Sequence, residues 1–205
     1  RRVVGPVASL STAPHLEVIR RFGQWSGSFD ATNYILPKFG QFVARNIRRS
    51  QSDVLVGWSS ATLEAITFAQ AAGMAVVIDR GASHIRSQNV ILDESYRQVG
   101  LEFPGIPRYV IDREEAEYEA ADKILVPSAQ AARSFRDNNV PTEKLAVVPL
   151  GVDVTRFCAD RTLAKDGKPK IVFVGSVGIR KGSHHLLNAF VRLGPLAELH
   201  LVGPM

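Results

Sequence analysis

The 205-residue sequence has little cysteine and no long hydrophobic run. Cys158 is its single cysteine, so no disulfide can form within the chain, and we interpret it as a buried thiol in a reducing compartment. No apolar stretch approaches the roughly 18 residues that a membrane-spanning helix needs. Gly5 and Pro6 interrupt the apolar start of the chain, so we do not expect the segment Arg1–Leu10 to act as a signal peptide. These absences favour a cytoplasmic globular protein.

The charge is moderately basic, with a formal net charge of +5 at pH 7. This charge fits anionic ligands or an anionic membrane surface, so peripheral contact with the inner membrane surface is one expectation. The arginines are scattered, and no recognition motif or aromatic-interleaved basic stripe is visible, so nucleic acid is not an expected partner. At 45% hydrophobic and 22% charged residues, the composition is that of a globular chain of one large or two small domains.

Short apolar segments alternate with helix-forming segments from residue 53 onward. We expect strands at 53–57, 74–79, 123–126, 145–148, 171–174 and 198–202, and helices at 60–72, 85–99, 109–121, 128–138 and 183–193. Gly73 is the expected C-cap of its helix, and Ser128 and Ser183 are expected N-caps. The alternation indicates an α/β fold with parallel sheets and right-handed crossovers. A polar stretch up to Pro169 resembles a linker, which predicts two Rossmann-like parallel-sheet domains, 1–150 and 151–205, facing a cleft and both incomplete.

The segment from Gly175 to Gly182 is a strand-to-helix loop that ends in Arg180-Lys181-Gly182. Two adjacent cations at a helix N-terminus lie against the positive end of the helix dipole, which is unfavourable unless an anion joins them. Glycines, free backbone N–H groups and two cations together predict a phosphate or diphosphate site. The alternative is an exposed basic pair beside a turn.

Several motifs that would assign this loop to other classes are missing. A P-loop has Gly-Lys-Ser/Thr after four intervening residues, but here Arg180 replaces the second glycine and Gly182 replaces the hydroxyl that would hold magnesium. The three spaced glycines of dinucleotide-binding folds are also missing. The chain has no Asp-x-Asp, and His184 and His185 are adjacent and expected on different sides of their helix, so we expect no bound metal and no cofactor.

Two further groups of polar residues allow a functional and a structural interpretation. His84 follows a predicted strand at the edge where open α/β sheets bind ligands, although a lone loop histidine is more often simply solvated. Arg113 and Glu117, like Glu115 and Glu119, are four residues apart on one predicted helix, which is typical of a solvated, salt-bridged helix face.

An ordered series of motifs from about Asp53 to Gly203 resembles a known family. The series consists of Glu115, Glu117, Ala121-Asp122, Val126-Pro127-Ser128, Pro149-Leu150-Gly151-Val152-Asp153, Phe157, Phe173-Val174-Gly175, Arg180-Lys181-Gly182, Leu186-Leu187, Ala189-Phe190 and Leu201-Val202-Gly203. In this order and spacing, the chain resembles a retaining glycosyltransferase of the GT-B fold, family 4. The segment Asp79-Arg80-Gly81 with His84 is similar to one branch of that family.

The resemblance implies a nucleotide-diphosphate sugar donor, held mostly by the second domain, and a carbohydrate or lipid-linked acceptor held by the first. Arg180 and Lys181 would neutralise the diphosphate leaving group, with Gly175, Ser176 and Gly182 around the phosphates. His84 would hydrogen-bond the donor or acceptor sugar. The resemblance also implies that the sugar keeps its anomeric configuration without a protein nucleophile. The diphosphate would leave from, and the acceptor would attack, the same face of the sugar ring.

Two departures from the family pattern limit which of the family's functional properties can be expected of this chain. Ser176 stands where relatives often have arginine, and the family's glycine-rich loop and paired glutamates have no counterparts here. We therefore expect a fragment with little or no transfer activity by itself. The alternative is a noncatalytic α/β nucleotide- or phosphate-binding remnant or partner module, and the gene sequence on both sides of this segment would distinguish the two.

Overall fold

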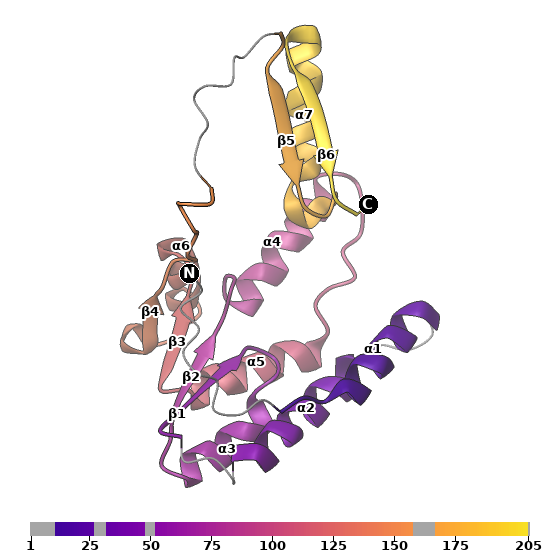
Figure 1. The fold of residues 1–205 in the computed structure, drawn as a ribbon. Coiled ribbons are helices and arrows are strands. Elements are labelled where there is room, and N and C mark those ends of the chain that lie inside the picture. Colours follow the sequence, from indigo (N-terminus) through magenta and orange to yellow (C-terminus); the bar gives the residue numbers. More distant parts are fainter. Residues whose placement is uncertain (1–10, 27–31, 48–51, 158–166, 205) are drawn as a thin grey trace. The chain divides into compact units, whose positions relative to one another are not determined.

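The chain forms two compact units, as seen in a computed structural model that describes residues 11–26, 32–47, 52–157 and 167–204. Unit 1 comprises Arg1–Gln88 and Ile106–Pro149, and unit 2 comprises Asn89–Gly105 and Leu150–Met205 (Figure 1). Cys158 and the segment Arg1–Leu10, both interpreted from the sequence, lie outside the described residues.

Unit 1 is built around a four-stranded parallel sheet in the order β1-β2-β3-β4. Its strands are β1 (Val54–Trp58), β2 (Ala75–Asp79), β3 (Lys123–Val126) and β4 (Leu145–Val147). Its helices are α1 (Pro14–Ser26), α2 (Thr32–Ile47), α3 (Leu63–Ala71), α5 (Arg108–Ala120) and α6 (Ala129–Arg136), with the 3-10 turn η1 (Thr142–Lys144). Helix α4 (Ile85–Arg97) begins in unit 1 and continues into the first segment of unit 2.

The core of unit 1 lies on one face of this sheet. Parallel strands taken in one direction with right-handed crossovers place every connecting helix on the same face. Accordingly, Val76, Ile78 and Ile124 are fully buried against α3, α5 and α6, where Phe135 is the largest buried side chain. On the opposite face, Val56 and Trp58 of β1 are each 62% exposed. The open face shows that the residues described here supply only one of the two helical layers of a doubly wound sheet.

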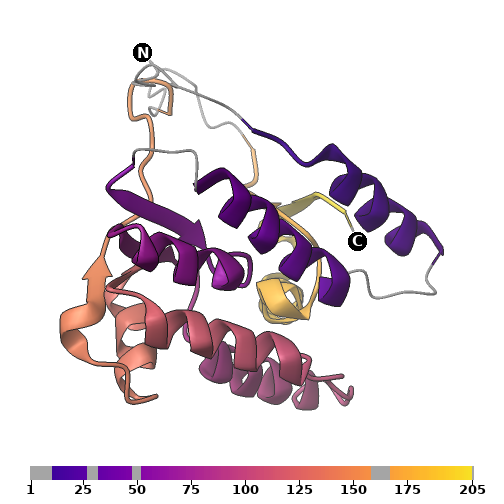
Figure 2. The same cartoon turned by 90° about the horizontal axis from the view of Figure 1, so that it is seen from below.

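Helices α1 and α2 were not among the elements that the sequence predicted. Helix α2 contains Pro37 and Gly40, two residues that disfavour helix interiors and hide the helical pattern. Packing accounts for the glycine, because a Cβ at Gly40 would lie 2.0 Å from Oε2 of Glu64 on α3. Figure 2 shows α2 lying along α3, against which it packs closely.

Unit 2 contains a two-stranded parallel sheet and one helix on it. The strands are β5 (Lys170–Val174) and β6 (Glu198–Val202), the helix is α7 (Ser183–Leu193), and two 3-10 turns, η2 (Ile179–Lys181) and η3 (Gly194–Leu196), flank the helix. Residues alternate along β5, with Val172 and Val174 exposed and Ile171 and Phe173 half-buried.

The expected α/β class with parallel sheets is confirmed, and so are most of the expected elements. Ser128 caps α6 as predicted, because its Oγ accepts the Ala131 N–H at 3.1 Å. Gly73 adopts φ +75° directly after α3, which is the left-handed conformation expected of a helix-terminating glycine. Within the described residues, no helix is both long and apolar enough to cross a membrane.

Candidate functional site

The loop between β5 and α7 in unit 2 gathers five of the six predicted site residues: Gly175, Ser176, Arg180, Lys181 and Gly182. The loop is anchored to the end of β6, since Gly175 N–H donates to the Val202 carbonyl at 2.9 Å and Val177 N–H donates to the Pro204 carbonyl at 2.8 Å. Gly175 has φ +143°, a conformation in which a side chain is strained.

A second glycine makes this anchoring possible. A Cβ at Gly203, whose φ is +145°, would lie 2.1 Å from the carbonyl oxygen of Gly175. The two strand ends therefore approach so closely that Gly203 cannot be replaced by a larger residue without movement of the backbone. By contrast, a Cβ at Gly175 would meet only the Phe173 ring, at 4.0 Å, so the outer side of the loop is open.

Arg180 and Lys181 lie in η2, directly before the N-terminus of α7. Both side chains are exposed, and neither forms an ion pair with any carboxylate in the part of the chain that the structure describes. Gly182, at φ +69°, is the N-cap and turns the chain into the helix. Two unpaired cations at the positive end of a helix dipole form an arrangement that an anion would stabilise.

Ser183 does not cap α7, contrary to the prediction. It is the first helical residue, and its hydroxyl donates to the Gly178 carbonyl at 2.9 Å instead of accepting from the helix. The prediction failed because Gly182 takes the capping position in the left-handed conformation, which moves the helix start by one residue. His184 and His185 were expected on different sides, but their ring centroids are 3.9 Å apart. Among the described residues, no group of three or more potential metal ligands is found.

The corresponding strand-to-helix loop of unit 1, between β1 and α3, binds a carboxylate of the chain itself. Glu117, fully buried on α5, accepts backbone N–H groups from Ser60 at 2.6 Å, Thr62 at 2.8 Å and Leu63 at 2.9 Å. Burial raises the pKa of Glu117, while these three N–H groups and Arg113 oppose the rise. The positive end of α3 is thus already neutralised by Glu117, whereas the two cations of the β5–α7 loop pair with no carboxylate among the described residues.

Arg113, Glu114 and Glu117 belong to a buried network, which corrects the sequence interpretation for Arg113 and Glu117. Glu119 is exposed and the partly exposed Glu115 pairs with Arg86, as expected of a solvated, salt-bridged face. Arg113 Nη1 donates to Glu64 Oε1 at 2.6 Å, and Arg113 Nε donates to the Ser60 carbonyl at 2.6 Å. Arg80 Nε lies 3.3 Å from Glu114 Oε2, and the Tyr118 hydroxyl donates to the same carboxylate. A spacing of four residues places side chains on one helix face, but this face packs against the loop after β1.

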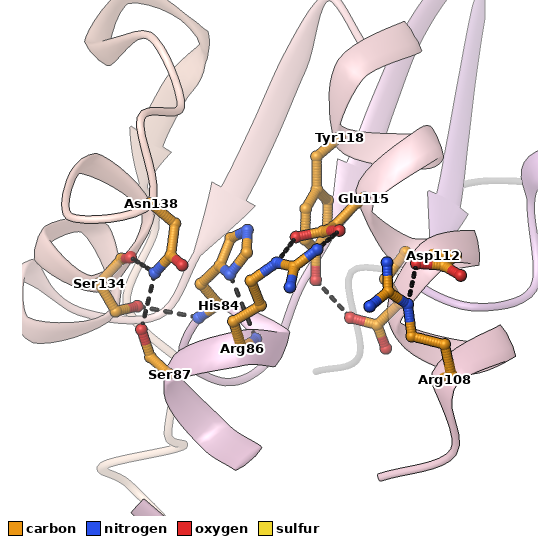
Figure 3. Close-up of polar contacts among 10 residues, drawn as sticks. His84, Arg86, Ser87, Arg108, Asp112, Glu115, Tyr118, Ser134 and Asn138 are labelled. Carbon is orange, nitrogen blue, oxygen red and sulfur yellow. Dashed lines mark hydrogen bonds and ion pairs between the residues drawn. The ribbon is translucent and has the colours of Figure 1, made fainter. Parts of the chain in front are cut away.

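His84 lies in unit 1 and is only 2% exposed, so it is not the solvated loop histidine that was one alternative. Its ring packs against Tyr118 and Phe135, with centroids 5.2 and 5.0 Å away. Nδ1 accepts the Arg86 N–H at 3.3 Å, and the His84 N–H donates to Ser134 Oγ at 2.8 Å (Figure 3). Burial lowers the pKa of His84 to about 4, so the imidazole is neutral near pH 7.

Comparison with known proteins gives one family and one structural similarity. The sequence profile of Glycosyltransferase Family 4 matches residues 3–156, whereas the β5–α7 loop lies beyond the matched region. No curated protein matches the chain. Among solved structures, the crystal structure of UDP-GlcNAc 2-epimerase from Neisseria meningitidis bound to UDP-GlcNAc is similar at 10% identity and a TM-score of 0.41. That similarity covers 85% of this chain and 55% of the epimerase, so the chain spans about half of the epimerase's length. Because the family profile covers well over half of its 205 residues, the chain belongs to glycosyltransferase family 4.

Proposed function

We propose that this chain is part of a glycosyltransferase that moves a sugar, with retention, from a nucleotide-diphosphate sugar to a carbohydrate or lipid-linked acceptor. Family membership supports the reaction class. The observation that carries the donor assignment is the pair of exposed cations, Arg180 and Lys181, at the positive end of α7, without carboxylate partners among the described residues. By contrast, the β1–α3 loop of unit 1 is filled by Glu117, whose carboxylate accepts the Thr62 N–H.

The proposed chemistry depends on charge that develops as the glycosidic bond breaks. The departing diphosphate gains negative charge, so its attraction to Arg180 and Lys181 is stronger in the transition state than in the bound donor. Gly175 leaves the backbone open to the phosphates, and the exposed Ser176 hydroxyl can donate to a phosphate oxygen. For His84, the proposal is a contact with a sugar as a neutral hydrogen-bonding group, because its imidazole carries no charge near pH 7.

Titration of UDP, GDP and ADP against wild type and the variants Arg180→Ala and Lys181→Ala tests the donor site. Each substitution removes a charge-assisted contact of roughly 1.5–3 kcal/mol, so we expect the affinity for the recognised nucleotide to fall about ten- to a hundredfold. The wild-type affinity should also weaken as salt is added, as expected for exposed charges. Isothermal titration calorimetry measures both effects.

Arg192→Ala is the matched control, because Arg192 is an exposed cation in the last turn of the same helix. It removes the same charge but lies at the opposite end of α7, so nucleotide affinity should not change. The helix dipole also predicts opposite effects on stability, with Lys181→Ala neutral or slightly stabilising and Arg192→Ala slightly destabilising. Equal nucleotide affinities in wild type and both loop variants would rule out the diphosphate site and leave an exposed basic pair.

A further inference from the structure

Unit 1 contains a pocket between α5, the end of α6 and the segment that leads into β4. Its volume is about 280 Å³, and its lining includes His84, Tyr118, Glu119, Asn138 and Val140. All the residues that line it belong to unit 1. The volume is just below the roughly 300 Å³ at which ligand pockets begin, so the pocket fits a single ring and not an extended chain.

The buried imidazole of His84 supplies a hydrogen-bond donor to this pocket. Nδ1 accepts the Arg86 N–H, so Nδ1 carries no proton and the proton of the neutral ring lies on Nε2. Figure 3 shows this second nitrogen on the side of the ring away from Arg86, in the space between Asn138 and Glu115. Within the described residues Nε2–H has no acceptor, and the rings of Tyr118 and Phe135 hold the imidazole in place. A fixed donor that lines a pocket and has no acceptor among the described residues selects a ligand that brings an oxygen to it.

Acceptors line the same pocket from α5 and from the segment after α6. Asn138 Nδ2 donates to Ser87 Oγ and to the Ser134 carbonyl, both at 2.8 Å, which leaves Oδ1 of Asn138 as an acceptor. The exposed carboxylate of Glu119 makes no hydrogen bond to any other residue that the structure describes. The side chain of Val140 adds an apolar wall. The pocket therefore presents a donor, two acceptors and an apolar surface within one small volume.

The charges around the pocket balance. Arg86 forms a bidentate ion pair with Glu115, and the Lys144 ammonium donates to the backbone carbonyls of Tyr118 and Glu119. The two carboxylates, of Glu115 and Glu119, are thus balanced in charge by the two cations, Arg86 and Lys144. A ligand with a net charge would gain no more attraction than repulsion here, whereas a neutral molecule with several hydroxyl groups would satisfy the free donor and both acceptors.

We propose that this pocket binds a neutral pyranose. One sugar oxygen accepts the proton of His84 Nε2, and two hydroxyl groups donate to Asn138 Oδ1 and the Glu119 carboxylate. The site is separate from the β5–α7 loop. The proposal that the bound sugar is a unit of the acceptor that does not take part in the reaction rests on the proposed function. The proposal that the pocket binds a sugar does not depend on that function.

The test is a titration of the full chain with the methyl pyranosides of glucose, galactose, mannose and N-acetylglucosamine, followed by NMR of the histidine ring nitrogens. At least one glycoside should shift the Nε2 resonance of His84 and leave that of His185, which is exposed on α7, unchanged. In His84→Phe, which keeps a ring between Tyr118 and Phe135, the affinity for that glycoside should fall about tenfold.

A second variant keeps the test valid if His84→Phe does not fold. Glu119 is exposed, so Glu119→Ala should fold normally, and the loss of one acceptor should weaken glycoside binding about threefold. No shift at His84 with any of the four glycosides would show that the pocket holds only water and would overturn the proposal. Tighter binding of glucuronate or glucosamine than of the neutral sugars would also overturn it. The nucleotide titration reports on the β5–α7 loop, so failure of either proposal can be recognised without the other.

Discussion

Glu117→Ala is expected to lower the free energy of unfolding of unit 1 by about 3–5 kcal/mol. Glu117 is fully buried, and its carboxylate accepts three backbone N–H groups from the loop between β1 and α3, at 2.6, 2.8 and 2.9 Å. Alanine would leave one buried and two part-buried N–H donors without this acceptor, and a cavity where the side chain was. Arg113, whose positive charge favours the ionised form of Glu117, would also lose this neighbouring carboxylate.

Urea unfolding followed by circular dichroism measures this loss, with Glu119→Ala as the control. Glu119 lies two residues further along the same helix, but its side chain is exposed, so its replacement should change stability by no more than about 0.5 kcal/mol. Glu117→Gln keeps one acceptor oxygen, so its loss of unfolding free energy should lie between those of Glu117→Ala and Glu119→Ala. A loss below about 1 kcal/mol for Glu117→Ala would mean that water replaces the carboxylate and that the loop does not depend on it.

The order of strands and helices after residue 53 could be predicted because the signal is local. Strand β6 has the predicted bounds and helix α7 ends at the predicted residue, since long apolar residues fill the strand and apolar residues recur at helical spacing in the helix. Helix α3, in contrast, starts at Leu63, three residues later than predicted. Its predicted first turn is instead the loop that Glu117 binds, and Ser60 adopts φ +71° there.

The buried charge network could not be predicted, because its contacts join segments that are distant in sequence. The hydrogen bonds that join Glu117 and Arg113 to α3 and the preceding loop span 49 to 57 positions, and Arg113 also donates to the Leu36 carbonyl, 77 positions away. An Arg-Glu spacing of four residues specifies a shared helix face but not whether that face meets water or protein. A buried arginine and glutamates of this kind are retained only when each is paired or hydrogen-bonded.

The candidate site residues, too, could be predicted from the sequence only in part. The β5–α7 loop could be located from the sequence because strand, glycine, cations and helix follow one another within a few residues. The surroundings of His84 could not, because Tyr118 and Phe135 come from α5 and α6, more than thirty residues further along the chain. The pocket beside His84 likewise depends on how these helices pack, which no local pattern specifies.

His84 should also make the stability of unit 1 depend on pH. In the unfolded chain an imidazole takes up its proton near pH 6.5, whereas burial lowers the pKa of folded His84 to about 4. Between these values the unfolded chain binds more protons than the folded chain, so stability falls as the pH falls. The contribution is fully present above pH 6.5, and about 3 kcal/mol of it is lost by pH 4, at 1.36 kcal/mol for each pKa unit.

Paired measurements on wild type and His84→Phe isolate this contribution from that of the carboxylates. Glu115 raises the pKa of His84, and Arg86 and Arg80 lower it, and all three charges remain in the variant. The carboxylates that titrate near pH 4 are therefore common to both proteins, and the difference between their unfolding free energies reports on the imidazole. We expect wild type to lose stability relative to His84→Phe steadily from pH 6.5 to 4, as measured by urea unfolding at each pH. A constant difference over this range would show that folded His84 titrates like an exposed histidine, and that its ring is not held in the packing of Tyr118 and Phe135.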